Sequence, residues 1–303
     1  MGNIGYCCIA VGINEGKKKK DHITVNRGMI KKTFDTKGLP YVTELTLQNI
    51  TDCKKILQYN VSKNILVYRL SSDMFPCIGF YKIKDLPKYN LIKSKMVDLG
   101  NYIKSHNIRV SLHPSHFNVL GSENPDVVIK TIDELDKHAE LMDMMELEQS
   151  TFYPINIHIG TTKPTCELAA QRFCDNFNLL SDSLKSRLTV ENDDSPNQYS
   201  VKMLYDMVYK VVKVPIVFDQ HHFLYGPQDQ TMEEALKLAI STWDTKALTH
   251  MSSSKKIEDE KSVATAHADY IYEKIETFGL DFDIEIEAKA KDKAVLKYRR
   301  DFN

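Results

Sequence analysis

The organisation of the chain is clearest at VPIVFDQHH, residues 214–222. Five nearly uniformly apolar residues precede Asp219, His221 and His222. A strand this apolar is typical of a parallel sheet, in which both faces of the strand are buried. Burial of carboxylate and imidazole groups costs free energy unless they are paired or bind a metal. We therefore expect the strand to end at a functional rim, where its polar side chains leave the core.

The same arrangement, an apolar run followed by polar residues, recurs along the chain. Eight such runs have the length of a strand and are rich in Val, Ile, Leu and Tyr. They are 3–12, 64–73, 108–117, 155–163, 187–194, 214–222, 247–254 and 282–289. Their regular recurrence predicts an eight-stranded structure.

The intervals between these runs have helical periodicity. In 124–145, an Asn-Pro-Asp start precedes apolar residues spaced three or four apart. The other expected helices are 45–60, 165–185, 195–211, 231–243 and 260–278. Strands that alternate with helices predict an α/β protein with a single (β/α)₈ TIM barrel, which forms one domain over residues 1–303. A doubly wound open sheet is the alternative.

Composition indicates a globular protein and leaves its partners open. Of the 303 residues, 42% are hydrophobic and 27% are charged. Because 40 Lys and Arg residues balance 41 Asp and Glu residues, net charge provides no bulk attraction to nucleic acid. No run approaches the roughly 18 apolar residues of a membrane-spanning helix, and the six cysteines form no CxxC pair. We expect a soluble intracellular protein, cytoplasmic or nuclear, without a membrane partner.

In a TIM barrel, the active site lies at the carboxyl ends of the strands. Six consecutive runs place a histidine or a carboxylate there. These residues are His113, His158, Glu191, Asp219, His250 and Glu287. A lone histidine at a strand end is usually structural. Three histidines and three carboxylates on one rim, however, indicate a metal site. Mixed imidazole and carboxylate ligands suit Zn²⁺, Mn²⁺ or Fe²⁺. Their number predicts two or three ions, with a carboxylate such as Glu191 as a bridge.

These residues, in this order, resemble the UV-damage endonuclease family of TIM-barrel DNA-repair enzymes, which is related in architecture to endonuclease IV. The matching motifs span nearly the whole chain and are GY, YRLSSDMFP, SLHP, HIG, VENDD, FDQHH, THMSSS, AHADYI and DIEIEAKAKDKA. The combination of ENDD, DxHH, AHADY and EAKxK is specific. The resemblance implies a multinuclear metal centre, commonly Mn²⁺, that cuts the DNA strand immediately 5′ to a lesion and leaves a 3′-hydroxyl.

The resemblance also implies roles for particular residues. The implied metal ligands are His113, His158, Glu191, Asp219, His222, His250, His267 and Glu287. The implied catalytic residues are Glu191, Asp219, His250 and Glu287. Contacts with damaged double-stranded DNA are expected from Tyr6, His116, Phe117, Lys289 and Lys291. Only the resemblance selects His267, because composition alone places it on a predicted helix. The enzyme is expected to act as a monomer.

Several positions depart from the family pattern. Phe80 occupies a position where the family usually has a histidine ligand, and Leu248 replaces a lysine that lies near the metals. Ala10 replaces an asparagine. His116 and Phe117 replace the Gln-Tyr pair that probes the helix at the lesion. The third metal site and the lesion preference depend on these substitutions.

Two other functions fit part of the pattern. A divalent-metal sugar isomerase or epimerase of the same barrel class also uses His, Asp and Glu at strand ends. Basic residues around 17–20 and 289–300 fit that function less well than a nuclease. A lesion-binding protein that has lost catalysis is favoured by Phe80, Leu248 and Ala10. Metal content and a nicking assay on damaged plasmid separate all three.

Overall fold

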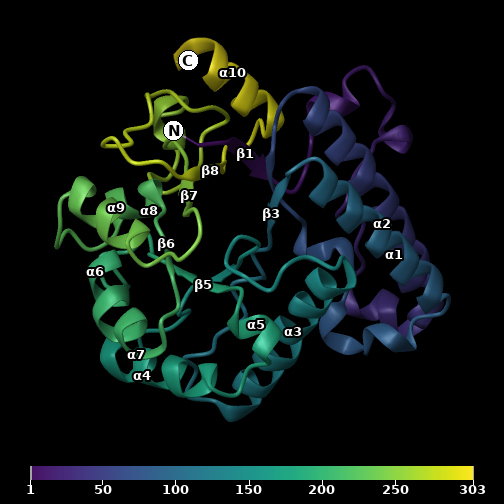
Figure 1. The fold of residues 1–303 in the computed structure, drawn as a ribbon, viewed down its shortest axis with the longest axis horizontal. Coiled ribbons are helices and arrows are strands. Elements are labelled where there is room, and N and C mark those ends of the chain that lie inside the picture. The colour runs from purple at the N-terminus through teal and green to yellow at the C-terminus, as the bar shows by residue number, and fades with distance from the viewer. Residues whose placement is uncertain (1, 303) are drawn as a thin grey trace.

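In the computed structural model, which describes residues 2–302, eight parallel strands form a ring with helices outside it (Figure 1). The strands are β1 (Ile4–Cys7), β2 (Val67–Arg69), β3 (Arg109–Ser111), β4 (Ile155–Ile157), β5 (Leu188–Glu191), β6 (Ile216–Val217), β7 (Leu248–Met251) and β8 (Asp283–Ile286). Each strand lies within one of the eight predicted runs. The predicted TIM barrel is confirmed, and the open sheet is excluded.

Strand pairing follows chain order around the ring. β1 pairs with both β2 and β8, so the two ends of the chain meet in one sheet. This sheet has the order β3-β2-β1-β8-β7, and a second sheet has the order β4-β5-β6. Single parallel bridges join the two sheets, one from Leu112 to Ile155 and one from Asp219 to His250. The carboxyl ends of all eight strands therefore share one rim.

Helices form the outer layer, and their apolar residues pack with those of the strands in one core cluster. They are α1 (Lys31–Ser62), α2 (Tyr89–Ser105), α3 (Pro125–Met144), α4 (Cys166–Phe177), α5 (Asp182–Lys185), α6 (Val201–Leu204), α7 (Lys210–Val212), α8 (Gln220–Tyr225), α9 (Met232–Ile240) and α10 (Asp292–Phe302). A π-helical turn, Tyr205–Tyr209, joins α6 to α7. Short 3₁₀ turns lie at Gly12–Asn14, Lys19–Asp21, Ser72–Met74, Ile78–Phe80, Ile83–Asp85 and Lys255–Ile257.

The starts of two helices follow capping signals in the sequence. The side chain of Asn124 accepts a hydrogen bond from an amide in the first turn of α3, and Pro125 occupies the first helical position. Thr231 and Glu234 form a reciprocal capping box at the start of α9. Both helices are confirmed, although α9 ends three residues before the predicted boundary.

Three other helices differ from expectation in their extent. The helix expected over 45–60 begins earlier and is interrupted at Gly38, which has a φ of 60°. The range 165–185 contains two helices, because the side chain of Ser181 caps a new one, α5. The range 195–211 becomes helical only at α6. Apolar periodicity continues through such breaks and therefore does not reveal them.

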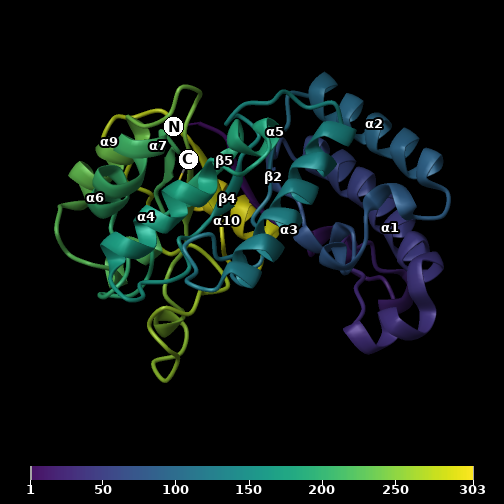
Figure 2. The same ribbon diagram turned by 90° about the horizontal axis from the view of Figure 1, so that it is seen from below.

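The helix expected over 260–278 is wrong. This segment belongs to the long connection between β7 and β8, part of which projects from the body as the yellow-green loop in Figure 2. Part of its backbone bonds to other segments: the Ala268 amide donates to the Ser253 carbonyl, and the Lys289 amide donates to the Ala268 carbonyl. His267 is thereby held beside the rim in an isolated antiparallel bridge.

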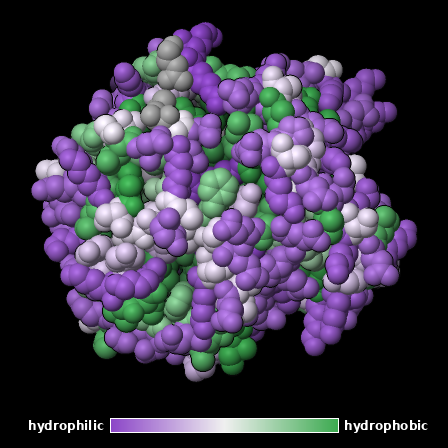
Figure 3. All heavy atoms as spheres, in the orientation of Figure 1, coloured by the Kyte–Doolittle hydropathy of each residue, from purple (hydrophilic) through white to green (hydrophobic). Residues whose placement is uncertain are grey.

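Hydrophilic residues cover most of the face shown in Figure 3, and hydrophobic residues occur there in small groups. All six cysteines are free thiols, as their scattered positions predict. Within residues 2–302, no helix has the length and apolar character needed to cross a bilayer.

Candidate metal centre

The strand-end residues predicted from the sequence converge at the rim, together with His222 from α8. They form three groups in which the possible ligand atoms all lie within 4.8 Å of one another. The groups are His113, His158 and Glu191; Glu191, Asp219 and His222; and Asp219, His250 and Glu287. Glu191 belongs to the first two groups and Asp219 to the last two. Shared carboxylates of this kind are suited to bridging neighbouring cations.

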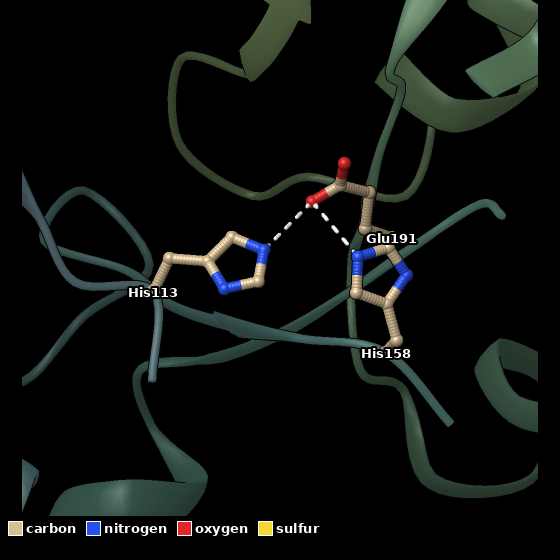
Figure 4. A group of neighbouring side chains, drawn as sticks. All are labelled: His113, His158 and Glu191. Atoms are coloured by element: carbon tan, nitrogen blue, oxygen red, sulfur yellow. Dashed lines mark ion pairs between the residues drawn. The ribbon is translucent and has the colours of Figure 1, made fainter. Parts of the chain in front are cut away.

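The first group shows how consecutive strands build the site. His113 follows β3, His158 follows β4, and Glu191 is the last residue of β5. In Figure 4 both imidazoles turn a nitrogen towards the Glu191 carboxylate. The Nε2 atoms lie 3.3 Å from Glu191 Oε2 for His113 and 3.8 Å for His158. The side-chain amide of Asn156 donates a hydrogen bond to the same carboxylate.

Three imidazoles leave Nε2 available to a cation because Nδ1 lies close to a backbone carbonyl oxygen. The pairs are His113 with Pro114 at 3.1 Å, His222 with Asn192 at 2.9 Å, and His267 with Glu287 at 2.9 Å. Since a carbonyl oxygen only accepts, Nδ1 is the donor in each pair, and Nε2 presents a lone pair whenever the imidazole is neutral. Metal-binding histidines typically donate their other ring nitrogen in this way.

The third group contains buried polar atoms that fit a cation. Asp219 is fully buried, and its Oδ1 accepts a hydrogen bond from the His222 amide at 2.7 Å. Its Oδ2 has no hydrogen-bond partner among residues 2–302, and neither does Nδ1 of His250. That nitrogen instead faces carboxylate oxygens of Glu191 at 3.1 Å and Glu287 at 3.6 Å. A buried carboxylate oxygen without a partner is costly, so a divalent ion suits this donor set.

The charges at the site depend strongly on one another. Burial by itself raises the pKa of Glu191, but His250 and His158 outweigh burial and hold it well below its usual range. Burial lowers the pKa of His222, but Asp219 and Glu191 raise it to about 11. Burial likewise lowers the pKa of His250, and Glu191 is the main group that raises it to about 10. An incoming cation must therefore displace protons from these imidazoles.

A buried ion-pair layer beneath the rim was not predicted. The Arg69 guanidinium, at the end of β2, lies 2.7 Å from Glu285 and 2.5 Å from Glu287. Its Nη2 lies 2.8 Å from Nε2 of His250. Burial raises the pKa of Glu285, but Arg69 and His250 lower it to about 2. The sequence carried a signal for this residue: Glu285 precedes Glu287 by two positions, and alternate residues of a strand share a face.

Asp193 is a second residue near the metal groups to which the sequence gave no role. Its Oδ1 lies 2.9 Å from Nδ1 of His158. This carboxylate orients the imidazole so that Nε2 turns towards Glu191, as the backbone carbonyls do for the other histidines. The motif ENDD contains Asp193, but the path of the loop after β5 decides which aspartate reaches the histidine.

The expected contact between Tyr6 and distorted bases is wrong. Tyr6 lies in β1 with its side chain fully buried. Its hydroxyl donates to Asn60 of α1 at 2.7 Å, and its ring packs edge-on against Tyr68. The side chain therefore points out of the ring into the helix layer, away from the rim. Apolar runs do not by themselves show which face of a strand a tyrosine occupies.

His116 and Phe117 lie on the loop between β3 and α3, three and four residues after His113. Their ring centroids are 4.1 Å apart, and Phe117 is 77% exposed. His116 lines the same cavity as His113 and His158. Both side chains are thus accessible from solvent beside the metal groups, and their contact with a lesion stays a prediction.

The remaining predicted residues lie close to β8. Lys289 is exposed and Lys291 is half-buried, both just beyond Glu287. His267 is in none of the three groups found within residues 2–302. Its Nδ1 lies 3.5 Å from Oε2 of Glu287, and its ring packs against His221. Ligation by His267 and phosphate contacts by the two lysines stay predictions.

The departures from the family pattern occupy different environments. Leu248 and Ala10 are buried. Phe80 is 55% exposed and packs against Phe34 with ring centroids 5.7 Å apart. It is not among the described residues that line the cavity shared by His113 and His158. The loss of a metal ligand at Phe80 stays a prediction.

Comparison with known proteins finds relatives that match nearly the whole chain. The sequence model of the family described as "UV-endonuclease UvdE" matches residues 2–303. A UV DNA damage endonuclease of Clostridium perfringens (strain 13 / Type A) is 30% identical over 303 residues, which cover 97% of this chain and 69% of the relative. The crystal structure of SacUVDE has 27% identity and a TM-score of 0.85, covering 99% of this chain and 97% of that one.

More distant structures share the fold alone. Endonuclease IV from Thermus thermophilus has 13% identity and a TM-score of 0.58, covering 82% of this chain and 93% of that one. D-psicose 3-epimerase from Clostridium cellulolyticum has 12% identity and a TM-score of 0.54, covering 78% of each chain. At these identities the comparison shows only that the barrel fold is shared, and function must be argued from the site.

Proposed function

The chain belongs to the UV-endonuclease UvdE family, and we propose that it is a metal-dependent DNA-repair endonuclease. In this proposal it nicks the DNA strand 5′ to UV photoproducts or other distorting lesions by hydrolysis of a phosphodiester. Its partner is damaged double-stranded DNA. Its cofactors are two or three divalent ions, with Mn²⁺ preferred to Zn²⁺ and Fe²⁺. Residues 1–303 act as one domain, and one copy of the chain suffices.

The proposal rests mainly on the three ligand groups that share Glu191 and Asp219. A site for a single ion would need only one such group. Three groups in a row, at the end of a barrel where substrate has access, match the demands of phosphoryl displacement, in which attacking and leaving oxygens both need stabilisation. The donors are imidazole and carboxylate groups, which suit Mn²⁺, Zn²⁺ and Fe²⁺.

The residues of the chain have distinct tasks in this proposal. Divalent ions, when bound, lower the pKa of water and offset negative charge on a phosphoryl group. Glu191 and Asp219 each serve two neighbouring groups, so they fix the spacing of the centre. His250 and Glu287 complete the third group. Arg69 contacts both of these residues and holds them in place from below.

Recognition of damage is assigned to the loop between β3 and α3. Phe117 is a large apolar side chain that is 77% exposed, and such a side chain can enter a weakened base step. His116 stacks beside it. Lys289 and Lys291 lie beyond Glu287, where they are available to DNA phosphates near the cleavage site.

A lesion-binding protein without catalysis is the second candidate. Leu248 favours it, because this buried apolar residue stands where the family has a lysine near the metals. Phe80, which cannot ligate a metal, favours it too. The ligand groups argue against it, since they supply three sets of imidazole and carboxylate donors of the kind that divalent ions require.

A nicking assay combined with metal analysis tests the proposal. Protein purified without chelator should contain more than one equivalent of Mn, Zn or Fe. It should nick UV-irradiated supercoiled plasmid and leave unirradiated plasmid largely intact. A chelator should abolish nicking, and Mn²⁺ should restore it. Damage-selective binding without nicking would establish the second candidate, and nicking by metal-free protein would refute metal dependence.

A further inference from the structure

A cavity of about 680 Å³ lies on the outer wall of the barrel, between α1 and α10. α10 forms one side, and the loop after β1, the end of α1 and the β7–β8 connection form the rest. None of the described residues that line it also lines the metal-site cavity. Its volume falls within the range of about 300–1,000 Å³ typical of small-molecule sites. We call this cavity the α1–α10 groove.

The lining of the α1–α10 groove is basic. Lys293, Lys297 and Arg300 belong to α10, and Lys63 is the residue that follows α1. Glu15 is the one carboxylate among the lining residues described, and it lies 2.5 Å from Nζ of Lys293. A concave surface lined by charges of one sign concentrates ions of the opposite sign. The groove is therefore suited to an anionic ligand.

The cations of α10 form a row along the groove. Lys293, Lys297 and Arg300 are four and three residues apart, so they share one face of the helix over about 10 Å. Like charges at these spacings repel each other. Asp301 offsets part of the repulsion, since it lies 2.5 Å from Lys297 and 2.9 Å from Arg300, but it is not among the lining residues. A row of anionic groups in the groove would offset the rest.

Buried hydrogen bonds hold the two sides of the groove together. Asp292, at the start of α10, is fully buried and accepts from the Gly12 amide at 3.0 Å and from the Tyr59 hydroxyl at 2.9 Å. Only glycine fits at position 12, because a Cβ would lie 2.4 Å from Oδ2 of Asp292. Near the other end of α10, Arg299 donates to the Lys63 carbonyl at 3.1 Å. The groove is therefore preorganised, which reduces the cost of binding a ligand.

We propose that the α1–α10 groove binds a linear oligophosphate, in which phosphate groups follow one another along a chain. Arg binds phosphate through its fork of N–H groups and Lys binds it as a point charge, so consecutive phosphates match the row of cations on α10. Lys63, whose Nζ lies 5.8 Å from the Tyr59 ring centroid, adds a cation from the α1 side. Tyr270 also lines the groove, and its hydroxyl can donate to a phosphate oxygen. The inference goes beyond the proposed function and does not rest on it.

Calorimetric titration with inorganic tripolyphosphate at fixed salt tests the groove. Because this probe ligates divalent ions, the full-length protein is first treated with chelator, and circular dichroism checks that it stays folded. Lys297→Gln and Lys63→Gln should each weaken binding by about tenfold, the loss of one charge-assisted hydrogen bond. Orthophosphate should bind at least about tenfold more weakly than tripolyphosphate, because a single phosphate group reaches fewer of the cations.

Two more variants give the test a sign and a control. Glu15→Gln removes the carboxylate from the lining and frees Lys293, so it should strengthen tripolyphosphate binding several-fold. General damage to the fold would weaken binding instead. Lys32→Gln is the matched control, because it removes the same charge from an exposed position on α1 that is not among the lining residues. It should leave the affinity unchanged.

A second probe, an undamaged single-stranded oligonucleotide, separates two sources of the phosphate groups. If Lys297→Gln weakens binding of tripolyphosphate alone, the ligand is a free oligophosphate. If it weakens binding of both probes, the groove also accepts the phosphate backbone of nucleic acid. The inference is overturned if Lys297→Gln affects tripolyphosphate binding no more than Lys32→Gln does, or if orthophosphate binds as tightly as tripolyphosphate. Nicking of UV-irradiated plasmid tests the proposed function separately, because the described lining residues of the groove lie outside the metal-site cavity.

Discussion

At the level of single residues, Glu191 has the most demanding position, because it belongs to two ligand groups and faces four imidazoles. We expect Glu191→Gln to reduce nicking by at least about 10³-fold, since the neutral amide cannot offset the charge of two cations. Metal content should fall, and the circular dichroism spectrum should be unchanged. Glu44→Gln, at an exposed position on α1, is the control. Full activity in Glu191→Gln would contradict the assigned role.

Arg69 is the guanidinium that pairs with both Glu285 and Glu287 in the buried layer. Arg69→Met should destabilise the metal-free protein by about 3–5 kcal/mol, because removal of one partner leaves buried charges without compensation. Urea unfolding in the presence of chelator measures this change in the free energy of unfolding. Arg300→Met should change it by less than about 0.5 kcal/mol, because Arg300 is exposed. Equal effects of the two substitutions would mean that Arg69 does not stabilise the buried ion-pair layer.

Tyr6 provides a test of its placement in the core. Tyr6→Phe removes the hydrogen bond to buried Asn60 and should destabilise the protein by about 1–3 kcal/mol. The ratio of affinities for damaged and intact duplex should stay the same, because the side chain lies in the helix layer. A reduced affinity ratio in a fully folded variant would mean that Tyr6 contacts DNA.

At the level of elements, the loop between β3 and α3 carries the recognition hypothesis. Unstacking a sound base step costs a few kcal/mol, so Phe117 should enter only where damage has already weakened stacking. Phe117→Ala should weaken binding to damaged duplex much more than binding to intact duplex, with metal content unchanged. His116→Ala should act in the same direction. Leu91→Ala, at an exposed position on α2, is the control. Equal losses for both duplexes would mean that Phe117 only packs the loop.

The elements also show what a sequence can predict. All eight strands were predictable, because a buried parallel strand is apolar along its whole length and ends in polar residues. The ligand groups followed from them, since strand ends of a barrel meet at one rim. The segment 260–278 was not predictable, because its backbone partners lie in the segments that follow β7 and β8 and its apolar spacing imitates a helix. Arg69 escaped notice for a similar reason, since its partners come from β7 and β8.

At the level of the whole molecule, the ligand groups coincide with a weak point of the ring. β6 and β7 are joined by a single bridge, between Asp219 and His250, and both residues belong to the third ligand group. A divalent ion there would hold the two sheets together. We expect Mn²⁺ at 100 times its Kd to stabilise the fold by about 2.7 kcal/mol. Thermal unfolding with Mn²⁺ and with chelator measures the shift, and equal Tm values would contradict it.

Because the cation displaces protons from imidazoles when it binds, its stabilisation of the fold should depend on pH. The pKa values of His222 and His250 are raised to about 11 and about 10, against roughly 6.5 in an unfolded chain. Their protonation therefore stabilises the metal-free fold fully below about pH 6.5, and this stabilisation is lost as the pH rises through about 10. Over the same range, the cation competes with fewer protons and binds more tightly. The difference in Tm between Mn²⁺-loaded and chelated protein should therefore grow from pH 6.5 to pH 8.5. His106→Ala, which removes a histidine remote from the rim, should leave that growth intact, whereas His222→Ala should reduce it. A difference in Tm that is constant with pH would mean that these imidazoles do not exchange protons for the cation.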